Sequence, residues 1–145
     1  MTVLEGEERG SLMPFGAALA LFALVAAAVA AFAMTRGDGL TEEQRVGRAV
    51  VGQNDALQRQ SYADYQKYTC ASEQSNEANV IGAQQESAGQ HGARYVDDVT
   101  DVTIDGQRAT AAVSYHFEKD PNSKRSTPLT FANQDGQWKV CSAYK

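Results

Sequence analysis

The sequence predicts an α+β protein in which one transmembrane helix is followed by a cone-shaped domain of two or three helices packed on a curved four-stranded antiparallel sheet. Three observations support this prediction. A long uncharged apolar stretch lies near the N-terminus, helical periodicity follows it, and strand-like alternation begins near residue 93. Helices that precede a run of strands joined by short turns are typical of an α+β domain, because such strands pair antiparallel.

The apolar stretch is residues 12–34, which contain no charged residue. As a helix at about 1.5 Å per residue it would be roughly 34 Å long, enough to cross a hydrocarbon core of about 30 Å. Small residues recur along one side of this helix, and small residues let two membrane helices approach closely. The predicted docking face consists of Gly16, Ala20, Ala23, Ala27, Ala30 and Ala31. Alanine is abundant throughout the stretch, so passive anchoring remains the alternative.

A cleaved signal peptide is the main alternative to a membrane anchor, because residues 31–33 have the A-x-A form of a cleavage site. However, the leader carries three glutamates and one arginine, whereas a signal peptide has a basic start and an apolar region of only about 7–15 residues. We therefore expect an uncleaved anchor. The predicted organisation is a cytoplasmic leader (1–11), a transmembrane helix (12–34), a hinge (35–40) and an extracytoplasmic domain (41–145).

Composition argues against several functional classes. The net charge is −5 and no basic patch is interleaved with aromatic residues, so we expect no nucleic-acid partner. Two histidines and two distant cysteines do not have the spacing of a metal site, so we expect no metal. No glycine-rich phosphate loop is present, and we expect no cofactor.

The two cysteines, Cys70 and Cys141, both lie in the globular part of the chain. An even pair in a small domain that follows a membrane span suits a disulfide in an oxidising compartment. Two unrelated buried thiols are the alternative. Basic residues near the span number one before it and three after it, which weakly favours a cytoplasmic domain. We give the cysteines more weight, because a trailing domain crosses largely regardless of charge. The prediction is a single-pass cell-membrane protein with a cytoplasmic N-terminus and an extracytoplasmic C-terminal domain.

Three helices are predicted before the sheet. Thr41 begins the first, which runs to about residue 60 and places apolar residues and Gln53 on one face. Ser61 begins a second, short helix with a sequence like a capping box, and this helix ends near Cys70. Residues 72–90 form a weak third helix with little apolar pattern.

Four strands are predicted over residues 93–104, 107–119, 126–133 and 137–144, with turns at 105–106, 120–123 and 135–136. A break in the alternation of the first strand predicts a bulge near Thr100. In the last strand Cys141 points away from the face of Trp138, although the helix that ends at Cys70 should pack on that face. Either the loop after Cys70 wraps around the sheet edge or the last strand has a bulge.

Two short helices followed by a curved meander resemble the nuclear-transport-factor-two-like, or cystatin-like, cone. An alanine-rich span, the helix start TEEQ, a cysteine after a tyrosine-bearing second helix and the ending DGQWKVC are similar to actinobacterial single-pass membrane proteins, among them the mammalian-cell-entry (Mce)-associated proteins. This resemblance covers roughly residues 12–145. It implies an extracytoplasmic domain that assists a larger cell-envelope assembly.

Enzymes on this cone use an apolar pocket with a carboxylate or histidine as base and a tyrosine or aspartate as proton donor. The candidates are Tyr65, His91, Asp97, Asp98, Tyr115 and His116, and their spacing does not converge on one site, so we expect no catalytic residues and no enzyme. Aromatic residues that could line a cavity, or simply form core, are Tyr65, Tyr115, Phe117, Phe131 and Trp138.

The leading hypothesis is a non-catalytic accessory subunit of a multi-span membrane complex, for example a lipid-transport or respiratory assembly. The first alternative is a membrane-tethered binder of lipid or another small apolar ligand in the cone. The second alternative is an isomerase-like enzyme.

Overall fold

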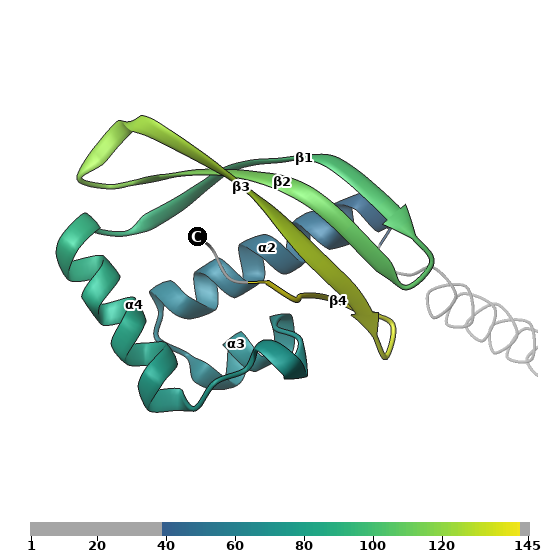
Figure 1. Ribbon diagram of the computed structural model, residues 1–145, viewed down its shortest axis with the longest axis horizontal. Coiled ribbons are helices and arrows are strands. Elements are labelled where there is room, and N and C mark those ends of the chain that lie inside the picture. Colours follow the sequence, from purple (N-terminus) through teal and green to yellow (C-terminus); the bar gives the residue numbers. More distant parts are fainter. Residues whose placement is uncertain (1–38, 143–145) are drawn as a thin grey trace, which may run out of the picture. The chain divides into compact units, whose positions relative to one another are not determined.

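The computed structural model describes residues 39–142 (Figure 1). The predicted leader, the predicted span with its docking face, and residues 35–38 of the predicted hinge lie outside the described residues. Within the described part, no helix is long and apolar enough to cross a membrane. The elements are α2 (Glu42–Gln58), α3 (Tyr62–Tyr68), the 3-10 helix η1 (Ala71–Glu73), α4 (Glu77–His91), β1 (Arg94–Asp105), β2 (Arg108–Phe117), β3 (Asp120–Gln134) and β4 (Gln137–Val140).

The start of α2 is fixed by a capping box. The Thr41 hydroxyl accepts a hydrogen bond from the Gln44 backbone N–H at 3.3 Å, and the Gln44 side chain accepts one from the Thr41 backbone N–H at 2.9 Å. The predicted helix start at Thr41 is therefore confirmed. The cap predicted at Ser61 does not form, because the Ser61 hydroxyl donates to the Asp64 carboxylate at 3.0 Å and caps no backbone N–H.

The four strands form one antiparallel sheet in the order β1-β2-β3-β4, which confirms the predicted meander. Turns follow β1 at Asp105 and β3 at Gln134, as predicted. The turn predicted at 120–123 is wrong: β2 and β3 are joined at Glu118 and Lys119, and β3 already begins at Asp120. β4 is shorter than predicted, since it ends at Val140.

β1 contains two irregularities, between Val96 and Asp98 and between Thr100 and Thr103. The second confirms the predicted bulge, and Asp101 within it has a left-handed φ of 52°. Each extra residue shifts the side-chain alternation by one. Val96, Val99 and Val102, spaced three apart, can therefore all pack against the core.

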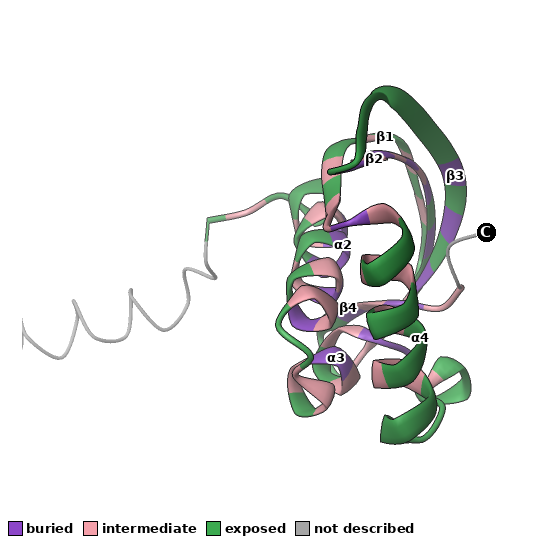
Figure 2. Ribbon diagram, turned by 90° about the vertical axis from the view of Figure 1, so that its left-hand side faces the viewer, coloured by how far each residue is buried: buried purple, intermediate pink, exposed green. Residues whose placement is uncertain are grey.

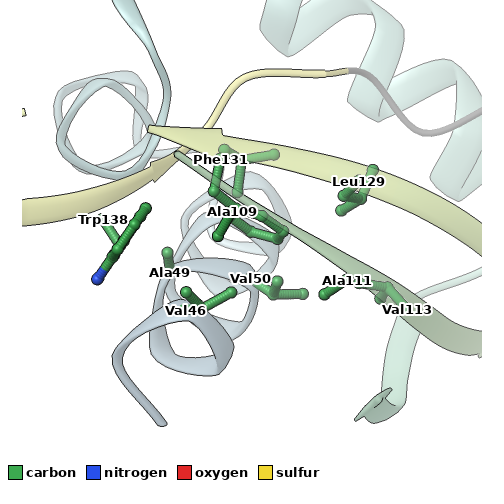
Figure 3. Packing of buried hydrophobic residues seen from close by; sticks show 10 residues of the cluster. Val46, Ala49, Val50, Ala109, Ala111, Val113, Leu129, Phe131 and Trp138 are labelled. Atoms are coloured by element: carbon green, nitrogen blue, oxygen red, sulfur yellow. The ribbon is translucent and has the colours of Figure 1, made fainter. Parts of the chain in front are cut away.

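The core lies between α2 and one face of the sheet. Figure 3 shows α2 side chains meeting residues of β2, β3 and β4, and Figure 2 shows the sheet curving around the helices. The buried cluster comprises Val46, Ala49, Val50, Ala109, Ala111, Val113, Leu129, Phe131, Trp138 and Val140. Burying a valine or leucine side chain stabilises the fold by about 1.5–3 kcal/mol relative to exposure. This layer of three helices on a four-stranded sheet confirms the predicted α+β class.

The segment after α3 lies beside the outer edge of β4. Thr69 pairs with Val140 in a parallel bridge, and the Cys70 backbone N–H donates to the Val140 carbonyl at 2.8 Å. Cys70 thereby reaches the side to which Cys141 points, and the two form a disulfide with a Cα–Cα distance of 4.9 Å. The predicted disulfide is confirmed, and the segment beside the edge explains how Cys70 reaches Cys141.

Among residues 39–142, no strand pairs with the outer edge of β3 beyond the reach of β4. The Thr130 carbonyl accepts from the Cys141 N–H at 2.7 Å, and the Thr130 N–H donates to the Ser142 hydroxyl at 3.0 Å. Because backbone direction alternates along a strand, Pro128 presents its backbone to the same edge. Proline has no N–H to donate, so the ladder cannot be continued there in the usual way.

α4 contains no fully buried residue (Figure 2). At its C-terminal end, Lys119 donates its ammonium to the Gly89 carbonyl at 2.6 Å and its backbone N–H to the His91 carbonyl at 3.1 Å. Near the middle of the helix, the Gln85 side chain donates to the Gln60 side chain at 2.9 Å. The turn between β2 and β3 is therefore hydrogen-bonded to the C-terminal end of α4.

Candidate functional site

A pocket of about 350 Å³ lies where α2, α3, η1 and α4 meet the start of β1. Most of its lining residues carry amides or hydroxyls: Gln53, Thr69, Ser75, Asn79, Gln84, Ser87 and Ser142. The remainder are Leu57, Tyr65, Val80 and Ala83, with Glu73 and Arg94 as the charged members. The volume falls in the lower part of the range of small-molecule sites, which is about 300–1,000 Å³.

Gln53 and Thr69 provide the most deeply buried polar groups of this pocket. Their exposed fractions are 4% and 1%, and the Gln53 amide nitrogen donates to the Thr69 hydroxyl at 2.9 Å. The helical periodicity of α2 turns Gln53 to the same side as Val46 and Val50, as predicted. A buried amide is costly unless it is hydrogen-bonded, so this contact maintains a polar surface inside the domain.

Tyr65 of α3 is the buried aromatic residue of the pocket. Burial raises the pKa of its phenol above the ordinary value of 10.0, and the neighbouring Thr69 side chain acts in the opposite direction. The phenol therefore remains protonated at neutral pH and is available as a donor. Its hydroxyl lies 3.5 Å from the Glu73 carbonyl, at the long limit of a hydrogen bond.

Arg94 is held by contacts from two other elements. Its Nε donates to the Asn54 side-chain oxygen at 2.9 Å, and the Asn54 amide donates back to the Arg94 carbonyl at 3.1 Å. Its guanidinium also lies 5.9 Å from the centre of the Tyr115 ring, within the range of a cation–π contact. The Arg94 side chain therefore has a fixed position in the pocket wall.

The aromatic residues predicted as a cavity lining lie in three places. Tyr65 lines the pocket described above. Phe131 and Trp138 belong to the buried core, and Phe131 also borders a second hollow of about 610 Å³ beside the disulfide. Tyr115 and Phe117 are buried and pack edge-to-face, with ring centres 5.7 Å apart. The structure does not bring the five rings into one cavity.

Of the acid–base candidates, Tyr65 lines the pocket, whereas both histidines and both aspartates lie outside it. His116 Nδ1 is 2.9 Å from the Asp97 carboxylate on the outer face of the sheet, and the Tyr95 ring stacks on this histidine. His91 packs against Phe117 at the end of α4, and Asp98 accepts a hydrogen bond from the Val99 N–H. The pairing of His116 with Asp97 was not predicted.

Within the described residues there is no group of three or more histidine, cysteine, aspartate and glutamate side chains that could hold a metal ion. Sequence reasoning identified Tyr65 but missed Arg94 and the polar residues of η1 and α4. Arg94 is 40 positions from Asn54, and no local pattern reports such a contact. The polarity of α4 was the one available signal, because a helix without an apolar face leaves its amides and hydroxyls for a site.

Several solved structures are similar to this chain. A protein of unknown function from Shewanella oneidensis MR-1, described as NTF-2 like, is 10% identical, with a TM-score of 0.47 over 69% of this chain and 94% of that one. A proposed dehydratase of the NTF2-like family from Streptomyces avermitilis is 12% identical, with a TM-score of 0.47 over 67% and 88%. An uncharacterised cystatin-fold protein from Novosphingobium aromaticivorans is 6% identical, with a TM-score of 0.43 over 64% and 92%. None of these similarities bears on activity.

A search of the curated proteins found no match. The family model described as the C-terminal domain of the low molecular weight antigen MTB12 matches residues 61–144. The matched region begins at α3 and includes η1, α4 and all four strands. Because this match covers more than half of the sequence, the chain belongs to the MTB12 C-terminal domain family.

Proposed function

We propose that this protein is a non-catalytic accessory subunit of a larger cell-envelope membrane complex, for example a lipid-transport or respiratory assembly. The observation that carries this proposal is the short distance along the chain between the predicted span and the folded domain. The cap of α2 is Thr41, so only residues 35–40 separate it from the predicted end of the span. Fully extended, six residues reach at most about 20 Å.

The short segment between the predicted span and α2 restricts which partners the domain can reach. A domain held within about 20 Å of a bilayer meets mainly proteins and lipids of that membrane. Binding through both the docking face of the span (Gly16, Ala20, Ala23, Ala27, Ala30 and Ala31) and the folded domain would make the second contact intramolecular. That arrangement strengthens overall binding even when each contact is weak.

The disulfide supports an extracytoplasmic location for the domain. Cys70 and Cys141 are joined, and such bonds persist in oxidising compartments but are rare in the cytosol. The candidate acid–base groups are dispersed: Tyr65 lines the pocket, His116 and Asp97 lie on the outer sheet face, and His91 lies at the end of α4. This dispersal suits a binding role better than a catalytic one. Kinship with the Mce-associated proteins stays a prediction.

The proposal is tested by replacing Ala23 and Ala27 together with leucine in the full-length chain. Larger side chains on the docking face prevent close approach of a second helix. We expect at least a tenfold loss of co-purifying membrane proteins, measured by quantitative mass spectrometry after mild detergent extraction. The matched control replaces Val25 and Val29 with leucine on the other side of the helix and should leave recovery within twofold. Unchanged co-purification in the alanine variant would refute the docking role.

A second candidate function is a membrane-tethered binder of a small molecule. The observation that favours it is the 350 Å³ pocket where α2, α3, η1 and α4 meet β1, called here the pocket below α4. Its lining combines buried hydrogen-bonding groups with a few apolar residues, an arrangement common in ligand sites. An isomerase-like activity stays a prediction.

A further inference from the structure

We infer that the pocket below α4 binds a small, neutral, hydroxyl-rich molecule, such as a polyol or a monosaccharide. This inference rests on the second candidate function and specifies its ligand. It departs from the lipid or apolar ligand that the aromatic residues of the sequence suggested.

The chemistry of the lining is the first argument. Amides are supplied by Gln53, Asn79 and Gln84, and hydroxyls by residues such as Thr69 and Ser87. Amides and hydroxyls both donate and accept hydrogen bonds, and so does every hydroxyl of a polyol. The lining therefore matches a ligand whose surface carries the same mixed groups.

Burial of the polar groups is the second argument. Gln53 and Thr69 bond each other away from solvent, so the polar groups that a ligand would shield from water are half-buried ones such as those of Gln84 and Ser87. A polar group that is shielded from water and gains no new partner is destabilised. An aliphatic chain offers no replacement hydrogen bonds, whereas a polyol does, so the pocket favours the polyol over a lipid tail.

Charge and size further restrict the ligand. Glu73 and Arg94 are the charged residues of the lining, and their formal charges cancel. Arg94 is engaged by Asn54 and by the Tyr115 ring, which fixes its position in the wall. A volume of about 350 Å³ suits one sugar ring better than a long acyl chain.

The test uses the full-length chain in phosphatidylcholine nanodiscs, because sugar-based detergents would compete for the pocket. Saturation-transfer NMR is recorded with glycerol, myo-inositol, glucose and galactose, and with octanoate as the apolar probe, each against empty nanodiscs. We expect transfer to at least one polyol and none to octanoate above the empty-disc signal. Gln84→Met should weaken polyol binding by about fivefold, as expected for the loss of one hydrogen bond.

Gln90→Met is the matched control, because Gln90 lies on the same helix but bonds Glu86 and is exposed. Gln90→Met should leave polyol binding unchanged. An equal loss of polyol affinity in Gln84→Met and Gln90→Met would overturn the assignment of the binding site to this pocket. Binding of octanoate alone would overturn the ligand class and leave a binding function standing. Binding of no probe would overturn both the inference and the second candidate function, while the docking role is judged separately by co-purification.

Discussion

Single polar residues determine the chemistry of the domain's interior. Gln53 occupies a position where the pattern of α2 calls for an apolar side chain, and its amide keeps the pocket polar. The sequence located this residue on the buried face but could not show its partner. Thr69 lies 16 positions away on another segment, and only folding brings the two together.

Asp64 gives the clearest pH-dependent prediction at the residue scale. Hydrogen bonds from Lys67, Ser61 and Arg59, in that order, lower the pKa of its carboxyl from 3.8 to about 2. A carboxyl with a lowered folded-state pKa stabilises the fold above its unfolded pKa, and this contribution is lost as the pH falls from 3.8 towards 2. The contribution is small, because the side chain is partly exposed and screened by solvent.

We therefore expect Asp64→Asn to lower the urea midpoint slightly at pH 6, and this difference should shrink as the pH falls through 2. Lys67→Met should raise the pKa of Asp64 towards 3.8, since the Lys67 hydrogen bond is the largest cause of the shift. Carboxyl-carbon NMR measures that pKa directly. A wild-type Asp64 with an ordinary pKa of 3.8 would contradict the claim that its hydrogen bonds lower this pKa.

At the scale of elements, α2 and α3 approach closely at a glycine. A Cβ added at Gly52 would lie 2.5 Å from the Tyr68 ring, whereas a Cβ at Gly47 of the same helix would meet nothing within 4 Å. The ring thus lies directly over the backbone of α2. The sequence showed that the second helix carries tyrosines, but it did not show that Gly52 of α2 contacts Tyr68.

Gly52→Ala should lower the free energy of unfolding by about 1 kcal/mol, because overpacking outweighs the better helix propensity of alanine. Gly47→Ala is the matched control and should raise it by about 0.5–1 kcal/mol. In a Tyr68→Ala background Gly52→Ala should become stabilising as well. Urea unfolding, followed by the fluorescence of Trp138, the chain's one tryptophan, measures the free energy of unfolding of each variant. Stabilisation by Gly52→Ala in the wild type would contradict the close contact.

Local signals explain which elements were predictable. The capping box of α2, the alternation of β2 and the Asp105 turn depend on neighbouring residues, so the sequence shows them. The turn between β2 and β3 depends on contacts of Lys119 with α4, which begins 42 positions earlier, and so it was misplaced. The first irregularity of β1 was missed for a similar reason, since packing against α2 selects which valines turn inward.

For the whole molecule, one covalent bond ties the helical half to the last strand. Cys70 and Cys141 are 71 positions apart, so their disulfide closes most of the folded domain into a loop. On the chain-entropy model a loop of this length stabilises the fold by about 4 kcal/mol. The pairing was predictable from the number of cysteines, but its route beside β4 was not.

The double variant Cys70→Ala and Cys141→Ala should lose about 2–4 kcal/mol of unfolding free energy, because its unfolded chain is no longer cross-linked. Urea unfolding of the full-length chain measures this loss, and the wild type with its disulfide reduced serves as the comparison. Thiol labelling in intact cells tests location. Free Cys70 and Cys141 in freshly isolated protein would argue against an extracytoplasmic domain.

Pro128 has a consequence for proteins that are crowded together. If the proposed membrane anchor is present, copies of the protein share a plane and collide in a limited set of orientations, so an open strand could pair with the same strand of a neighbour. Pro128 has no backbone N–H, so one of the hydrogen bonds that such strand pairing requires cannot form. The side of β3 beyond the reach of β4 can therefore face its neighbours without recruiting them.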